Sequence, residues 1–197
     1  MTKVSQADLI AGAIAKGVVS FPTDTVPALA VKPESAQTIF ELKQRSATKP
    51  LILMGASLDD LFSYVSGTSA ELTIWQQTIK QYLPGAITFI LPASPNLPPA
   101  INPLNPQTVG IRIPAHKIAC EILQQTGVLA TTSANLSGEA PLITMTEIDR
   151  AFPTVLVLED DNLDNSLKTG SGMPSTVVKW AENTWQVIRQ GSVKLNE

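Results

Sequence analysis

The chain has 197 residues, 44% of them hydrophobic and 16% charged, which is typical of a folded globular protein and argues against a largely disordered one. This length fits one domain with a substantial buried core. The formal net charge of -3 disfavours a protein whose main task is to grip nucleic-acid backbones, because such domains carry a strong basic excess, and it leaves room only for a local basic cleft.

The chain offers few residues for metal, disulfide or nucleophilic chemistry. Its single cysteine, Cys120, excludes an intrachain disulfide and a Cys-rich metal site, and its single histidine, His116, excludes a multi-His zinc site. Cys120 lies in an apolar stretch and is expected in the core, whereas His116 is expected at the start of a helix. Residues 1–5 lack a signal-peptide pattern, and no apolar run approaches the roughly 18 residues of a membrane span, so we expect a cytoplasmic protein without membrane contact.

Helix and strand signals alternate from the first residues onward. Ser5 and Asp8 form a capping-box pattern that predicts a helix start, and Gly17 predicts the end of that helix. Thr68 and Glu71 form a second pattern of this kind. In chain order up to residue 91, we expect a helix over 5–17, strands over 18–21 and 28–31, a helix over 34–42, a strand over 51–54, a helix over 68–83 and a strand over 86–91.

The second half of the chain opens with a proline-rich stretch. Six of the 15 prolines fall within 92–106, so this segment is expected to be a stiff extended loop that could cover a site. The mixture of elements predicts one α/β domain with a mixed sheet whose strand ends converge on one concavity. The remaining expected elements are strands over 108–113, 128–132 and 154–158, helices over 115–126 and 144–151, a surface loop over 160–173, and a closing hairpin over 175–178 and 185–188.

Three cations, Arg45, Lys49 and Arg112, lie in or directly after apolar segments. Arginine can hold a carboxylate or phosphate through two parallel hydrogen bonds, and lysine adds a point charge. Taken alone, Lys49 is more typical of a solvated surface charge. Arg112 differs because it belongs to the apolar run 110–113, where a charged side chain needs a partner or a ligand.

Small polar side chains follow two of the expected strands. Ser133 and Asn135 could hold phosphate or ribose oxygens together with nearby backbone amides, although a simple Asx or Ser turn fits the spacing equally well. The cluster 23–25, Thr-Asp-Thr, could orient an amino acid or a metal-bound phosphate, or form a turn after the strand. The loop over 133–138 lacks the Gly-rich pattern of a P-loop, which is therefore not supported.

Together these clusters resemble the YrdC family of threonylcarbamoyl-AMP synthases over nearly the whole chain, from 16 to 191. The matching motifs lie in family order at 21–26, 43–51, 83–88, 109–114, 133–138 and 174–178, and six ordered matches are far more specific than any one of them. The resemblance implies an α/β fold in which a twisted mixed β-sheet, flanked by helices, surrounds a concave basic cavity. It also implies a single YrdC-like domain over 1–197, without the additional carboxyl-terminal domain of longer members.

The same resemblance implies a nucleotidyltransferase activity. L-threonine, bicarbonate and ATP would give threonylcarbamoyl-AMP and pyrophosphate, with Mg²⁺ arriving with ATP and not at a fixed protein site. A separate transferase complex would then pass the threonylcarbamoyl group to tRNA, and weak direct RNA binding is left open. The carbamate formed from threonine and bicarbonate is itself the nucleophile, so positioning and cationic stabilisation can carry the reaction without a catalytic Ser, Cys or His.

Site roles are carried over from the matched motifs one residue at a time. The implied catalytic motif consists of Lys43, Arg45, Ser133 and Asn135. The implied threonine contacts are Thr25, Arg112, Thr131 and Ser175, with Arg112 on the carboxylate. The implied ATP contacts are Arg45, Lys49, Thr108, Ser133, Pro141 and Arg189.

Two positions depart from the family pattern. Many members carry Tyr-Gly where this chain has Pro27 and Ala28, and some carry His where it has Met54. Both departures fall on the implied threonine pocket. The alternative reading is a YrdC-like RNA-binding or maturation accessory protein without synthase activity, and a third is a related carbamoyl-adenylate enzyme that acts on carbamoyl phosphate.

Overall fold

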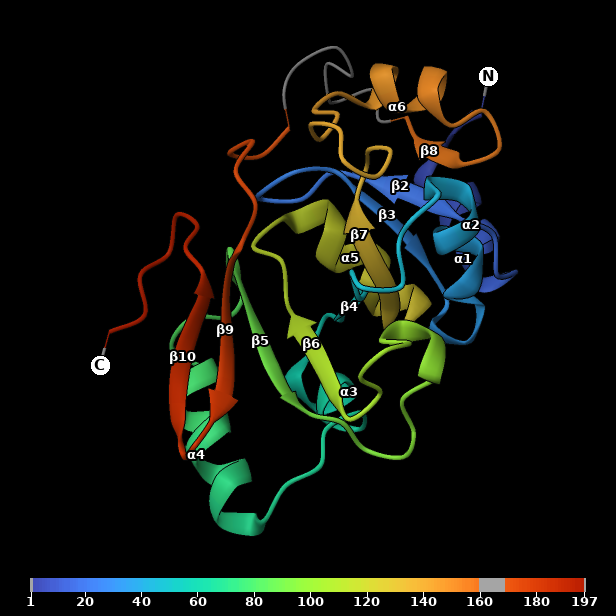
Figure 1. Ribbon diagram of the computed structural model, residues 1–197. Helices are drawn as coiled ribbons and strands as arrows, with labels where there is room; N and C mark the ends of the chain where they lie inside the picture. Colours follow the sequence, from blue (N-terminus) through green and yellow to red (C-terminus); the bar gives the residue numbers. More distant parts are fainter. Residues whose placement is uncertain (1, 160–168, 197) are drawn as a thin grey trace.

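Ten strands of the described chain form one continuous mixed sheet (Figure 1). The structure is a computed structural model that describes residues 2–159 and 169–196. The strands are β1 (Lys3–Val4), β2 (Val19–Phe21), β3 (Ala28–Val31), β4 (Ile52–Met54), β5 (Ile87–Pro92), β6 (Thr108–Arg112), β7 (Leu129–Ser133), β8 (Leu156–Leu158), β9 (Thr176–Ala181) and β10 (Thr184–Arg189). Across the sheet they lie in the order β1-β8-β2-β3-β7-β4-β6-β5-β9-β10. The pairs β1–β8, β2–β8, β4–β6 and β5–β9 are parallel and the other neighbours antiparallel, which confirms the predicted mixed sheet.

Helices connect most of these strands, and polar side chains cap several of them. The α-helices of the described chain are α1 (Gln6–Ile14), α2 (Gln37–Lys43), α3 (Leu58–Phe62), α4 (Ser69–Ile79), α5 (Lys117–Thr126) and α6 (Met145–Ala151), with 3₁₀-helices η1 (Pro33–Ser35) and η2 (Pro99–Ile101). Ser5 caps α1 by accepting a hydrogen bond from the Asp8 amide, and Thr68 and Glu71 form a full capping box at α4, as predicted. His116 lies at the cap of α5, at the predicted helix start.

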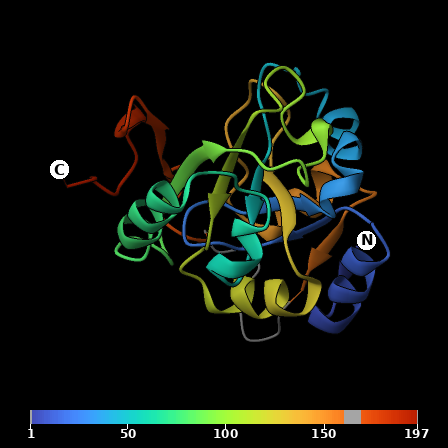
Figure 2. The ribbon, with the colours of Figure 1, turned by 90° about the horizontal axis from the view of Figure 1, so that it is seen from below.

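Two clusters of buried apolar side chains hold the helices to opposite faces of the sheet. Successive strand residues point to opposite faces, so Leu29 belongs to the larger cluster and Ala28 and Ala30 to the smaller one. Figure 2 shows α1 and α5 side by side along the face of the smaller cluster. The larger cluster on the other face takes its helical members from α2, α3, α4 and α6.

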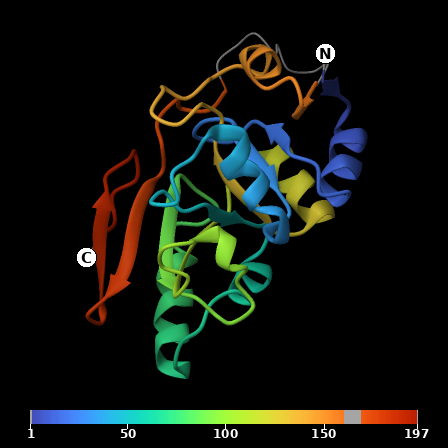
Figure 3. The ribbon, with the colours of Figure 1, turned by 45° about the vertical axis from the view of Figure 1, so that its right-hand side comes forward.

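The hairpin of β9 and β10 forms one end of the sheet, and α1 lies at the other end (Figure 3). The two turn residues of this hairpin, Glu182 and Asn183, both have positive φ, at 52° and 60°, which is the geometry of a tight hairpin turn. Trp180 and Trp185 pack edge to face with ring centroids 5.1 Å apart, and Trp185 also meets Phe89 of β5 at 5.1 Å. The predicted closing hairpin is confirmed.

Three helix ends differ from their predicted positions. Lys16, with φ of 66°, takes the left-handed conformation after α1, whereas Gly17 was expected to end that helix. The predicted helix over 34–42 begins only at Gln37 because the tighter η1 turn precedes it. The predicted helix over 68–83 ends at Ile79, after which the chain tightens into turns with hydrogen bonds between residues three apart.

Other expectations need correction or lie outside the described residues. The proline-rich segment 92–106 contains η2, and its Leu97 and Ile101 are buried in the larger core cluster, so it packs against the body of the fold. Cys120 is half-buried and packs against that cluster instead of lying inside it. Helix α3 was not expected from the sequence, and the predicted loop over 160–173 lies outside the described residues for 160–168. No helix of the described segments is both long and apolar enough to span a bilayer.

Candidate functional site

A cavity of about 620 Å³ opens on the sheet face that also carries α1 and α5. The floor of the cavity is a face of the sheet, and the register of the strands decides which residues lie on it. Ile52 of β4 pairs with Gly110 of β6 and Thr131 of β7, so the three residues share one face. Two positions further along β4, Met54 pairs with Arg112. The volume lies within the range of small-molecule sites, and none of the residues 93–106 lines it, so the predicted cover by the proline-rich loop is wrong.

Gly110 lies between two residues of this floor, Ile52 and Thr88. A Cβ atom added there would lie 2.9 Å from Cγ2 of Ile52 and 3.3 Å from Cγ2 of Thr88, so no larger residue fits without displacing its neighbours. Thr88 of β5 places its hydroxyl 2.9 Å from the hydroxyl of Ser175, which precedes β9. The floor is therefore a surface of aliphatic side chains and small hydroxyls.

Arg112 is the most buried cation of the cavity, with a side chain only 3% exposed. Its Nε donates to the carbonyl of Gly85 at 3.0 Å, Nη1 to the hydroxyl of Thr25 at 2.9 Å, and Nη2 to Oδ1 of Asp24 at 2.6 Å. Burial lowers the pKa of Arg112, and the Asp24 carboxylate raises it. The expectation that this arginine needs a partner in its apolar strand is met by Asp24.

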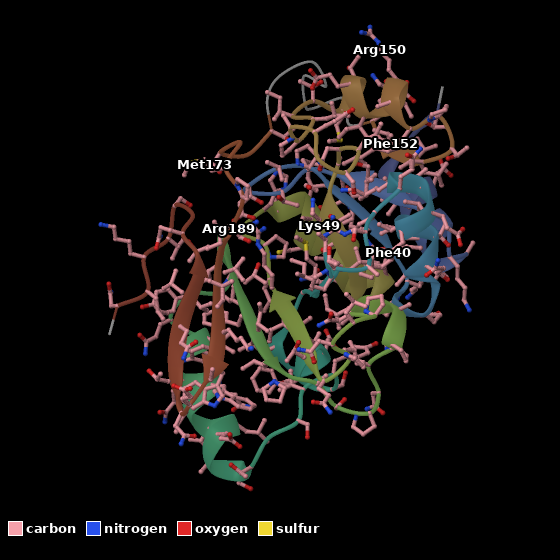
Figure 4. The ribbon with its side chains drawn as sticks, viewed as in Figure 1. Phe40, Lys49, Arg150, Phe152, Met173 and Arg189 are labelled. Carbon is pink, nitrogen blue, oxygen red and sulfur yellow. The ribbon has the colours of Figure 1, made fainter. Side chains whose placement is uncertain are left out.

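Arg45 and Lys49 line the cavity from the loop between α2 and β4. Arg45 donates from Nε to the carbonyl of Lys49 at 2.8 Å and from Nη2 to the carbonyl of Pro50 at 2.9 Å, so it fixes the loop that carries both cations. Burial lowers the pKa of Arg45. Figure 4 shows Lys49 and Arg189 close together in the middle of the view, although Arg189 ends β10 at the far edge of the sheet.

Lys43, at the end of α2, lies behind the cavity lining and is fully buried. Its Nζ donates to the carbonyl of Ser133, and lies 3.3 Å from the Thr132 hydroxyl and 3.4 Å from Oδ1 of Asn135. Burial, followed by the charges of Arg45 and Lys49, lowers the pKa of Lys43 to about 7. Lys43 and Asn135, which the resemblance placed in one catalytic motif, are 92 residues apart in the chain and lie in contact in the structure.

The loop after β7 forms another part of the cavity lining. The Ser133 hydroxyl donates to Oδ1 of Asn135 at 2.5 Å, and the Asn135 amide group donates to the carbonyls of Leu136 and Glu139 at 2.7 and 2.9 Å. Ser137 also lines the cavity, and its buried hydroxyl has no hydrogen-bond partner in the described chain. Asn135 therefore shapes a loop that turns its small side chains inward.

Most of the predicted site residues meet in this one cavity. The lining includes Thr25, Arg45, Lys49, Arg112, Thr131, Ser133, Asn135, Pro141, Ser175 and Arg189. Lys43 lies directly behind it, and Thr108, at the opposite end of β6 from Arg112, is not among the lining residues. Thr108 instead accepts a hydrogen bond from the Asn102 amide at 3.0 Å, so its expected ATP contact has no support in the cavity geometry.

Several lining residues were not assigned a role from the sequence. Thr88 was part of a matched motif, but its position in an apolar strand gave no sign that its hydroxyl meets Ser175. Pro27, Ala28 and Met54, the departures from the family pattern, all line the cavity. The pairing of Asp24 with Arg112 joins residues 88 apart, a contact that spacing alone does not predict.

The charges of the lining suit a polyanion together with a smaller carboxylate. Arg45, Lys49, Arg112 and Arg189 are cationic, and Glu139 is the one acidic residue among the described residues that line the cavity. Within 2–159 and 169–196, no group of three or more His, Cys, Asp or Glu side chains is arranged to hold a metal ion. Fixed cations around small hydroxyls define a class of protein: an α/β domain that binds a phosphorylated ligand and a small carboxylate in one cavity.

Comparison with known proteins identifies the family. The family model for Sua5, YciO and YrdC proteins, described as telomere recombination, matches residues 13–191. The chain therefore belongs to the Sua5/YciO/YrdC family, which confirms the resemblance found in the sequence.

Two curated relatives are both named threonylcarbamoyl-AMP synthase. The human protein is 32% identical over 195 residues, which cover 96% of this chain and 66% of the relative. The Histophilus somni (strain 2336) protein is 35% identical over 181 residues, which cover 88% of this chain and 92% of the relative. The chain thus spans just under two thirds of the length of the human relative.

A solved structure reported as P. abyssi Sua5 complexed with L-threonine superposes with a TM-score of 0.80 at 27% identity. The alignment covers 96% of this chain and 55% of the P. abyssi chain. This similarity confirms the predicted α/β fold with a mixed sheet flanked by helices.

Proposed function

We propose that this chain is a threonylcarbamoyl-AMP synthase, which forms threonylcarbamoyl-AMP and pyrophosphate from L-threonine, bicarbonate and ATP. The observation that carries the proposal is the single cavity in which four cations surround a hydroxyl-rich floor. The names of the relatives and the threonine bound to the P. abyssi protein support the same reading.

In the proposed complex the two substrates occupy different parts of the cavity. Arg112, beside Thr25, takes the threonine carboxylate, while Thr131 and Ser175 complete the amino-acid side. Arg45, Lys49 and Arg189 surround the phosphates of ATP, where charge-assisted hydrogen bonds are strongest. The phosphate side is completed by Ser133, Asn135 and Pro141, with Lys43 behind them.

The reaction needs no protein nucleophile. The threonine amine condenses with bicarbonate to a carbamate with loss of water, a carbamate oxygen attacks the α-phosphorus of ATP, and pyrophosphate leaves. The cations stabilise the charge that develops on the phosphate oxygens, and the cavity holds the carbamate in line with the leaving group. The aliphatic side chains among the hydroxyls of the floor limit the access of water that would compete with the carbamate.

Magnesium and the downstream partners belong to the same proposal. Mg²⁺ enters with ATP as part of the substrate, because it is held mainly by phosphate oxygens, water and one or two carboxylates. The product then passes to a separate transferase complex that modifies tRNA. A net charge of -3 fits an enzyme that hands on a small adenylate and does not grip tRNA itself.

Pyrophosphate release tests the proposal. Purified protein is incubated with ATP and Mg²⁺, with and without L-threonine and bicarbonate, and L-serine in place of threonine serves as the matched amino-acid control. We expect release only when threonine and bicarbonate are both present, with serine less effective. Release that ignores the amino acid would contradict the proposal, and ATP binding without any release would favour the RNA-binding accessory protein.

A further inference from the structure

The guanidinium of Arg112 reaches the cavity with its orientation already set. Three of its five N–H donors are directed at protein acceptors: the carbonyl of Gly85, the hydroxyl of Thr25 and the carboxylate of Asp24. One N–H on each terminal nitrogen is left for a ligand, and Arg112 lines the cavity. Two N–H groups can hold both oxygens of a carboxylate only while the guanidinium plane keeps its orientation.

Asp24 contributes the shortest of these contacts, at 2.6 Å, but it does not line the cavity. Its side chain is 15% exposed and approaches Arg112 from the loop between β2 and β3. Because Asp24 meets the guanidinium from outside the lining, its side chain acts on a ligand through Arg112 and not by direct contact.

The loop that carries Asp24 is itself held in place by a second segment. The amide of Ser171 donates to the Asp24 carbonyl at 3.0 Å, and that of Gly172 to the Thr25 carbonyl at 2.8 Å. Gly170, with φ of 64°, fits so closely that an added Cβ would lie 2.4 Å from the Thr23 carbonyl oxygen. The backbone on both sides of Asp24 is therefore held by hydrogen bonds and close packing, which keeps its carboxylate in place against Arg112.

We propose that Asp24 is a positioning residue for amino-acid recognition, because it fixes the plane of the Arg112 guanidinium so that its two remaining N–H donors face the substrate carboxylate. This inference rests on the proposed function, in which Arg112 takes that carboxylate. Asp24 thereby sets the affinity for the amino acid without touching it, and leaves the phosphate side of the cavity unaffected.

A purely structural ion pair would behave differently. Removing one member of a buried pair destabilises the fold, which would weaken every ligand alike or none. Positioning instead predicts a loss confined to threonine. Asn in place of Asp24 keeps an oxygen that can accept the Arg112 N–H, so it separates geometry from charge, whereas Ala removes both.

The test measures the dissociation constants of L-threonine and of ATP by calorimetry for the wild type, Asp24→Ala and Asp24→Asn. Asp149→Ala is the matched control, because Asp149 accepts two hydrogen bonds from Thr2 and does not line the cavity. Asp24→Ala is expected to weaken threonine binding about tenfold, because Arg112 loses the charge-assisted contact that holds its guanidinium plane. Asp24→Asn should restore most of the affinity, and ATP binding should stay within about twofold in every variant.

Each outcome decides the proposal. Unchanged threonine affinity in Asp24→Ala, or an equal loss for threonine and ATP, would overturn it. If Asp24→Ala does not fold, Asp24→Ser takes its place, since it keeps a small polar side chain but removes the carboxylate that holds Arg112, and unchanged threonine affinity there would overturn it equally. Wild-type protein that binds threonine but releases no pyrophosphate refutes the proposed function alone, and protein that binds no threonine refutes both.

Discussion

Lys43 is the residue whose charge the fold controls most strongly. It is fully buried, its pKa falls from 10.5 to about 7, and its acceptors are a carbonyl, a hydroxyl and the amide oxygen of Asn135. The unfolded chain therefore binds one more proton than the folded chain between pH 7 and 10.5. Stability is expected to rise with pH through this window, because folding releases the proton of Lys43 and this release becomes easier as the pH rises.

Lys43→Met tests this assignment. The variant has no ammonium to bury, so it should lose the part of the stability gain between pH 7.5 and 9.5 that Lys43 causes, which approaches about 1.4 kcal/mol per pH unit for one proton. Urea unfolding at several pH values measures the difference. Lys32→Met, which removes a lysine bonded to the carbonyl of Thr126 at the end of α5, is the matched control. Parallel pH profiles for wild type and Lys43→Met would contradict the lowered pKa.

The sequence identified the residues of the site better than it identified their contacts. Arg112 was singled out because a charge in an apolar strand needs a partner, and the structure supplies Asp24. Spacing could not tell whether that partner is a ligand or a protein group. Thr108 fitted a motif but faces Asn102, because a position in a strand gives the face of a side chain but not its distance from the cavity.

At the scale of elements, β6 determines the shape of the cavity floor. It pairs with β4 and β5, and Gly110 lies where a side chain would meet both neighbours. Glycine loses more backbone entropy on folding than any other residue, so Gly110 is explained by the space that it leaves and not by a gain in stability.

Gly110→Ala is expected to destabilise the fold by about 1–3 kcal/mol, because the added methyl group lies 2.9 Å from Cγ2 of Ile52 and the floor must shift. It should also weaken threonine or ATP binding by raising the floor. Urea unfolding and calorimetry measure the two effects. Gln186→Ala, at an exposed position of β10, is the control and should change neither quantity. Wild-type stability in Gly110→Ala would contradict the close packing of this floor.

Elements with strong local signals were predicted well, and short ones were not. The capping box of α4 and the two-residue turn of the β9–β10 hairpin each depend on four or fewer adjacent residues, so the local sequence is enough to predict them. Helix α3 and the 3₁₀-helix η2 are too short to show a period, and packing of Leu97 and Ile101 into the core decides the path of the proline-rich segment.

At the scale of the whole molecule, the cavity exists because strands distant in sequence become neighbours. The strand order places β9 beside β5 and β7 between β3 and β4, pairings that periodicity does not specify. The mixed sheet was predicted from the mixture of helices and strands and is confirmed, whereas the order of the strands was not predicted. The single domain over 1–197 stays a prediction.

The most direct test of the central claim, that one cavity joins threonine, bicarbonate and ATP, is to identify the product. The protein is incubated with ¹³C-bicarbonate, L-threonine and ATP with Mg²⁺, and the nucleotides are analysed by mass spectrometry. We predict an adenylate that contains threonine and the labelled carbon, and that is absent when threonine is omitted. An adenylate without the label, or hydrolysis of ATP alone, would contradict the account.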